Sequence, residues 1–107
     1  MKKVYRLKKN HDISKIVNLK QFVNSFSFTI YYNKNEFDHA RVCVSVSKKL
    51  GIAVIRNKTK RQVREMIDKI FDFNKNTDYV VVVRRKYFDF DFHENFKILE
   101  KIYSKIR

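Results

Sequence analysis

A dense run of cations in one short stretch is the feature of this sequence best suited to chemistry. Residues 45–65, SVSKKLGIAVIRNKTKRQVRE, hold seven Lys or Arg residues, one acidic residue and the only glycine of the chain, Gly51. Arginine can bind a phosphate group with two parallel hydrogen bonds, and asparagine can donate to a phosphate or a sugar. The residue types therefore indicate binding of a polyanion.

The spacing of these cations predicts an ordered array. Three of them recur at four-residue intervals on a predicted helix, which sets neighbouring side chains about 6 Å apart. Gly51 precedes the helix and allows either a turn with positive φ or a close approach of the backbone to a ligand. The candidate polyanion contacts are Arg56, Asn57, Lys60, Arg61, Arg64, Lys48 and Lys49.

A solvated basic helix face is the alternative interpretation of this array. Solvated faces usually interleave both signs of charge, because like charges four residues apart repel one another. Glu65 is the only acidic residue between Arg41 and Ile67. The uncompensated repulsion favours an anion supplied by a partner.

The whole chain shares this charge imbalance. Its 107 residues include 25 Lys or Arg and 11 Asp or Glu, a formal net charge of +14. Such self-repulsion disfavours a compact state unless a polyanion neutralises it. Nucleic acid is the partner that this size and charge favour. No membrane partner is expected, because a membrane-surface protein would present one long amphipathic basic helix and no apolar run is long enough to span a bilayer.

Catalytic and metal-ligating constellations are poor in this sequence. The histidines are scattered over two predicted helix starts and a loop, at His11, His39 and His93. None is paired with a cysteine or carboxylate at metal-ligand spacing. Cys43 reads as a small strand residue rather than a nucleophile, and a single cysteine suits a reduced, cytoplasmic protein. The acidic residues within 89–94 are better explained by helix capping than by cation binding.

Hydrophobic periodicity predicts the elements that position the cations. The order helix-strand-strand-helix-strand-helix indicates an α+β sandwich, a single RNA-binding domain over residues 1–107 with helices packed on a sheet. Helices are predicted over residues 10–19, 56–73 and 92–106, and strands over residues 26–32, 41–47 and 79–83, with a small extra strand at 22–24.

The first two long strands predict a sheet with one apolar and one small-polar face. Strand 26–32 alternates large apolar residues with Ser27, Thr29 and Tyr31, and strand 41–47 alternates three valines with Cys43, Ser45 and Ser47. The loop between these strands favours direct antiparallel pairing. Tyr31 is then an aromatic ring on a wettable face, where it can stack on an unpaired base. Alternatively, Tyr31 packs under the first helix with its hydroxyl outward.

The cation-rich stretch resembles the signature of a known family, the bacterial ribonuclease P protein component. Residues 56–64, RNKTKRQVR, are similar to the basic motif of that family, within a wider match over residues 45–64. Residues 6–10, 28–31 and 78–82 also resemble the family, so the resemblance covers nearly the whole chain.

The resemblance implies the small subunit of a ribonucleoprotein that removes the 5′ leader from precursor tRNA. In that family the RNA subunit, with bound Mg²⁺, is the catalyst, and the protein supplies neither a catalytic residue nor a cofactor. Its partners are the ribonuclease P RNA and the precursor leader, with no obligate protein partner. The family also joins two parallel strands by a left-handed crossover, which is rare among proteins.

The resemblance further assigns the basic motif to the RNA subunit and a cleft on the sheet face, beside the first helix, to the single-stranded leader. The leader-binding candidates are Tyr31, Thr29, Ser45, Ser47, Ile13, Val17, Lys8 and Lys9. Ile13 and Val17 stand where the family often has phenylalanine, so these two positions offer the leader apolar contact but no aromatic ring for stacking. A general RNA-binding or ribosomal protein remains the alternative. A protein-only nuclease would need the clustered acids or histidines that this sequence lacks.

Overall fold

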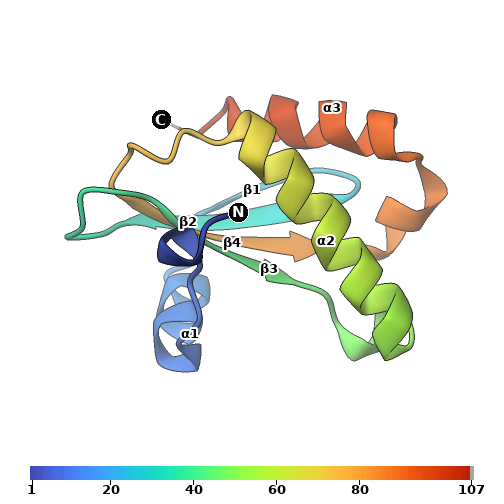
Figure 1. Ribbon diagram of the computed structural model, residues 1–107, viewed down its shortest axis with the longest axis horizontal. Coiled ribbons are helices and arrows are strands. Elements are labelled where there is room, and N and C mark those ends of the chain that lie inside the picture. Colours follow the sequence, from blue (N-terminus) through green and yellow to red (C-terminus); the bar gives the residue numbers. More distant parts are fainter. Residues whose placement is uncertain (107) are drawn as a thin grey trace.

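The structure is a computed structural model that describes residues 1–106, and it confirms the α+β class. Four strands form one mixed sheet in the order β1-β2-β4-β3 (Figure 1). The strands are β1 (Phe22–Asn24), β2 (Phe28–Lys34), β3 (Arg41–Ser45) and β4 (Thr77–Val83). The helices are α1 (Asn10–Asn18), α2 (Ala53–Ile70) and α3 (Phe92–Tyr103), with short 3₁₀ turns η1 (Lys3–Tyr5), η2 (Lys48–Leu50) and η3 (Arg85–Asp89).

Strand β4 lies inside the sheet, a position predicted by the near-continuous apolar run of residues 79–83. It pairs antiparallel with β2 and parallel with β3. The prediction that the strands at 26–32 and 41–47 pair directly is therefore wrong, because β4 separates them. A strand that is apolar on both sides needs both of its faces covered, and the centre of the sheet provides that cover as well as a neighbouring strand on each edge. Val80 and Val81, which point to opposite faces, are both buried.

Helices α2 and α3 cover one face of the sheet and enclose the main core (Figure 1). Full burial of a Val, Leu, Ile, Phe or Met side chain in this core contributes about 1.5–3 kcal/mol. Hydrophobic periodicity predicts a core-facing stripe on α2, and the structure buries the first four of its five members. The members are Thr59, Val63, Met66, Ile67 and Ile70. The sheet residues opposite include Phe28, Ile30, Val42, Tyr79 and Val81.

Helix α1 packs on the other face, which is therefore only partly open (Figure 1). Its residue Ile16 is buried with Leu7 and Val80 in a small second cluster. The sequence predicts an accessible second face, and the structure leaves accessible only the part that α1 does not reach.

The helix ends differ from the predicted ends for local reasons. Helix α2 begins at Ala53 rather than at the predicted Arg56. The prediction missed the first turn because that turn is exposed and carries no burial periodicity; Val54 is 73 % exposed. It ends before Phe71, whose ring leaves the helix and stacks on Tyr103 at a centroid distance of 4.1 Å. Helix α3 begins with a capping box of Asp91 and Glu94, which confirms capping as the role of those acids.

Ser27 does not lie on the small-polar face, contrary to the alternation. Strand β2 begins only at Phe28, and the preceding turn reverses the expected directions. The Ser27 hydroxyl is buried beneath α3 and donates to Asn95 Oδ1 at 2.6 Å. Asn95 Nδ2 in turn donates to the carbonyl of Tyr87 at 2.9 Å. Phe26, expected in the core, is 63 % exposed.

Candidate nucleic-acid interface

The turn before α2 fixes the first cation of the motif. Gly51 has φ of 155°, and a Cβ there would lie 3.1 Å from the side chain of Ile55. This position favours glycine both by conformation and by space. The Gly51 carbonyl accepts a hydrogen bond from Arg56 Nε at 3.2 Å. The tight turn therefore orients a guanidinium as well as the chain.

The four-residue row on α2 runs along the β3 edge of the sheet. Arg56, Lys60 and Arg64 are half-buried, whereas Asn57 and Arg61 on the next rows are exposed. Burial raises the pKa of the Cys43 thiol on β3, and the positive charges of Lys60 and Arg64 oppose that rise. These two cations therefore lie close enough to the open face to act on it electrostatically.

The motif cations have no carboxylate partner within residues 1–106. The salt bridges in this part of the chain join Arg41 to Asp78 and to Asp12, and the N-terminal amine to Asp68. The array is therefore ordered by backbone and packing while its charge stays uncompensated, as the sequence predicts. Such a surface attracts an anion, and α2 supplies it with repeating donors.

The open face of the sheet carries two rows of side chains that cross all four strands. The strand register gives the first row as Asn24–Thr29–Val82–Ser45 and the second as Phe22–Tyr31–Val80–Cys43. Ile13 and Val17 of α1 pack against the second row and are half-buried. The structure thus brings these candidates together with Tyr31 and Thr29.

Tyr31 packs under α1, as one of its two interpretations predicts, and it also remains partly accessible, as stacking on a base would require. Its side chain packs in the α1 cluster, yet it is only half-buried. The ring of Phe22 lies 5.4 Å from it, tilted by 49°. Two neighbouring aromatic rings therefore border the part of the face that α1 leaves open.

Ser47 lies outside these rows, unlike Ser45. Strand β3 ends at Ser45, and the chain turns away into η2. The Ser47 hydroxyl accepts a hydrogen bond from the backbone of Lys49 at 3.2 Å, so it caps that turn. Lys48 and Lys49 are exposed beside it. The predicted strand over 41–47 is therefore two residues too long, although its alternation holds, with Val46 buried in the core and Ser47 exposed.

A small hollow joins the motif to the open face. Arg64 from α2, Lys8 from the segment before α1, and Cys43 line it, with a volume of about 130 Å³. Arg6 also lines it, and its Nε is buried without a hydrogen-bond partner among the described residues. Arg6 was missed as a site residue, although it begins one of the segments that resemble the family. Lys9 is exposed at the start of α1, outside this hollow.

Arg41 was also missed, and it holds α1 against the sheet. Its guanidinium donates to Asp78 at 2.9 and 2.6 Å and lies 3.8 Å from Asp12 of α1. The hydrogen bonds to Asp78 raise the pKa of Arg41 above its ordinary value. The ring of Phe37 lies 4.5 Å from the guanidinium carbon. Hydrophobic periodicity could not reveal this role of Arg41, because its partners Asp78 and Asp12 are distant in the chain.

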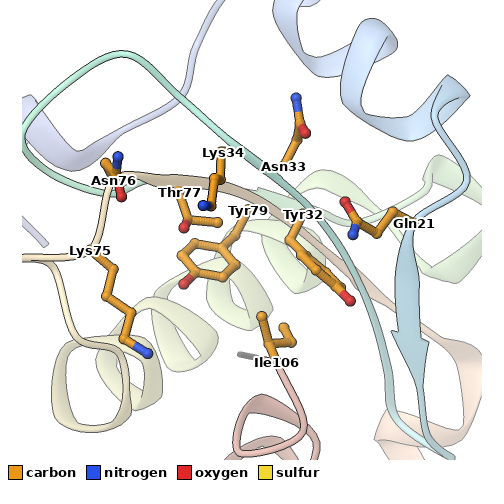
Figure 2. A pocket seen from close by; sticks show the side chains of 9 residues that line it. All are labelled: Gln21, Tyr32, Asn33, Lys34, Lys75, Asn76, Thr77, Tyr79 and Ile106. Carbon is orange, nitrogen blue, oxygen red and sulfur yellow. The ribbon is translucent and has the colours of Figure 1, made fainter.

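A second hollow lies where β2 ends and β4 begins (Figure 2). In this view the rings of Tyr32 and Tyr79 lie on either side of Ile106, and Lys34 and Lys75 also line the hollow. Burial raises the pKa of Tyr79 above its ordinary value. None of the predicted site residues lines this hollow.

Two further observations concern metal-binding groups and membrane-spanning helices. In residues 1–106, no group of three or more His, Cys, Asp or Glu side chains is arranged to hold a metal ion. None of the helices over the same residues combines the length and hydropathy needed to cross a membrane.

The sequence profile of the family described as Ribonuclease P matches residues 1–107. The chain belongs to this family. It is 44 % identical over 85 residues to the ribonuclease P protein component of Streptococcus equi subsp. equi, which covers 79 % of this chain and 71 % of the relative. The family supports a subunit of ribonuclease P, an enzyme of tRNA processing, and implies an RNA subunit as partner.

Solved structures of the family match the fold closely. The Staphylococcus aureus RNase P protein superposes with a TM-score of 0.87 at 36 % identity, over 96 % of this chain and 95 % of that one. A mutant of the S. aureus protein, described as having defective mRNA degradation activity, matches with the same TM-score and identity over 96 % of this chain and 88 % of that one.

This superposition also decides the hand of the β3–α2–β4 crossover. A crossover of the opposite hand would place α2 on the face that α1 occupies, and the chains could not then superpose so well. The crossover therefore has the same hand as the one in the S. aureus protein.

Proposed function

We propose that this chain binds the RNA subunit of ribonuclease P through the cations of α2, and the single-stranded leader of precursor tRNA on the open sheet face. The observation that carries the proposal is an ordered row of uncompensated cations beside a partly open face that is bordered by the rings of Phe22 and Tyr31. RNA offers the two complements of these surfaces, a regular phosphate backbone and unpaired bases.

The two surfaces divide the work by their chemistry. The exposed side of α2 presents Asn57 and Arg61 next to the half-buried row, and it suits the backbone of a folded RNA. The sheet face combines Tyr31, Thr29 and Ser45 with the apolar wall of α1, and it suits unpaired nucleotides. Arg64 and Lys8 meet at the corner between the surfaces, where they can hold the leader near the RNA subunit.

Cleavage belongs to the RNA subunit in this proposal, with Mg²⁺ bound there. The residues of this chain bind and position the RNA in this proposal. Neutralisation of phosphates by the protein lowers the repulsion between precursor and RNA subunit. The protein should therefore matter most when Mg²⁺ is scarce.

Reconstitution with a ribonuclease P RNA tests the proposal. We expect the protein to stimulate 5′ processing of precursor tRNA at low Mg²⁺, and to do so less as Mg²⁺ rises. A variant with Arg61→Glu and Arg64→Glu should lose the stimulation, whereas Lys34→Glu with Lys75→Glu, an equal change of charge, should retain it. Preferential binding of ribosomal RNA, without stimulation, would favour a general RNA-binding protein instead.

Degradation of mRNA is a second candidate, favoured by the described property of the S. aureus mutant. Incubation of the purified protein with an mRNA, without any RNA subunit, tests it. Cleavage that copurifies with the protein and is lost in the Arg61→Glu, Arg64→Glu variant would support it. No cleavage under conditions in which the reconstituted enzyme processes precursor tRNA would exclude it.

A further inference from the structure

A groove between the β1–β2 turn and α3 lies outside both surfaces described above. Its volume is about 610 Å³, and every charged residue that lines it is a cation. The four cations are exposed, and none has a carboxylate partner within residues 1–106. They are Arg84, Lys86, Lys101 and Lys105. The groove is thus a second place where the chain accumulates positive charge without balancing it.

The floor of the groove is apolar. Ile98 and Ile102 of α3 contribute to it, beside the exposed ring of Phe26. Lys86 Nζ lies 5.4 Å from the centre of that ring. An exposed aromatic ring among cations is the combination by which proteins bind single-stranded nucleic acid, through stacking on bases and attraction of phosphates. An acidic peptide would satisfy the cations but would have no use for the ring.

The groove is continuous with the open sheet face. Asn24 Oδ1 accepts hydrogen bonds from Thr29 Oγ1 and from Arg84 Nη1, each at 2.9 Å. Thr29 belongs to the first row of the open face, and Arg84 belongs to the groove. In Figure 1 the β1–β2 turn passes beneath α3, which covers the other face of the sheet, so a strand that leaves the open face reaches the groove by passing round this end of the sheet.

We infer that this groove binds leader nucleotides farther from the cleavage site than those on the sheet face. The inference rests on the proposed function, and it adds a second segment to the leader path. Nucleotide bases stack on Phe26, while the four cations hold the adjoining phosphates. The groove should then favour long leaders over short ones, with little preference for sequence.

Leader length in the reconstituted enzyme tests the inference. Single-strand-binding domains occupy about 4–16 nucleotides, so precursors with leaders of about 4 and about 16 nucleotides bracket the two segments. We expect the longer leader to bind more tightly to the wild-type enzyme. Lys101→Glu with Lys105→Glu, and separately Phe26→Ala, should remove about tenfold of that gain and leave the short-leader precursor unchanged. Phe26→Tyr should retain it, because it keeps a stacking ring.

Lys34→Glu with Lys75→Glu is the matched control, since it makes the same change of charge around the other hollow. A loss of affinity equal for both leaders, or equal in the control, would mean that only net charge matters and would overturn the inference. An unchanged gain from the longer leader in the groove variants would also overturn the inference. This holds whether or not a polyglutamate peptide binds the groove. Failure of the wild-type protein to stimulate the RNA subunit would instead overturn the proposed function.

Discussion

Arg41 and Asp78 are register partners on the parallel strands β3 and β4, and their side chains meet through two hydrogen bonds of 2.9 and 2.6 Å. Asp78 also accepts a hydrogen bond from Asn35 at 2.7 Å, and its side chain is 8 % exposed. Asp12 of α1 lies 3.8 Å from the same guanidinium. One guanidinium therefore links the two parallel strands to the helix that borders the open face.

We expect Arg41→Met to destabilise the fold by about 2–3 kcal/mol. The substitution keeps an apolar side chain but leaves the Asp78 carboxylate largely buried without its cation, which is the costly way to break such a pair. Urea unfolding at low salt measures the loss. The matched control is Asp68→Asn, which removes an exposed partner of the N-terminal amine and should cost less than about 1 kcal/mol. Equal losses would contradict the structural role of Arg41.

Much of the fold could be predicted because its elements have strong local patterns. The apolar run of β4 predicts a central strand, and the stripe on α2 predicts which of its residues are buried. The pairing of strands was mispredicted, because a short loop favours a hairpin locally while the burial of β4 is decided by the whole sheet. Ser27 was misplaced for a related reason, since its buried partner Asn95 is 68 residues away.

The candidate site divides in the same way. The cation row on α2 follows from four-residue spacing alone, so the sequence predicts it fully. Arg6, Arg41 and the groove of Arg84 and Lys101 need the tertiary arrangement, because each joins segments that are far apart in the chain. Single cations in a sequence so rich in lysine and arginine carry no signal of their own.

Alkaline pH should destabilise the protein through Tyr87. Burial raises its pKa to about 12, and its hydroxyl donates to Gln62 Oε1 at 2.9 Å. The unfolded chain loses this proton near pH 10. The unfolded state thus binds fewer protons between about pH 10 and 12, so stability is fully present below that range and falls as pH rises through it.

Tyr87→Phe tests this pH dependence. The variant should lose some stability at pH 8, because the hydrogen bond to Gln62 is gone, and should show a shallower decline between about pH 10 and 12. The decline should not vanish, since burial also raises the pKa of Tyr79. Urea unfolding midpoints at a series of pH values provide the measurement. A parallel decline in both proteins would show that Tyr87 does not contribute.

The cation row should be visible in the salt dependence of RNA binding. Substitution of four motif cations by alanine should lower affinity for the RNA subunit and reduce the slope of log K against log salt by about one unit for each phosphate that the protein no longer neutralises. The substituted residues are Arg56, Lys60, Arg61 and Arg64. Filter binding at several salt concentrations measures the slope. Lys34→Ala with Lys75→Ala serves as the control, and an unchanged slope in the motif variant would count against this assignment.

Tyr31 should contribute to binding of precursor tRNA more than of mature tRNA. Stacking on a base is worth about 1–3 kcal/mol, and the half-burial of Tyr31 beside α1 favours the lower end. Tyr31→Ala should therefore weaken precursor binding about tenfold, while Tyr31→Phe, which keeps the ring, should have little effect. Affinities of the reconstituted enzyme for both tRNAs provide the measurement, with urea unfolding to confirm that each variant is folded. Equal weakening for both tRNAs would place Tyr31 outside the leader path.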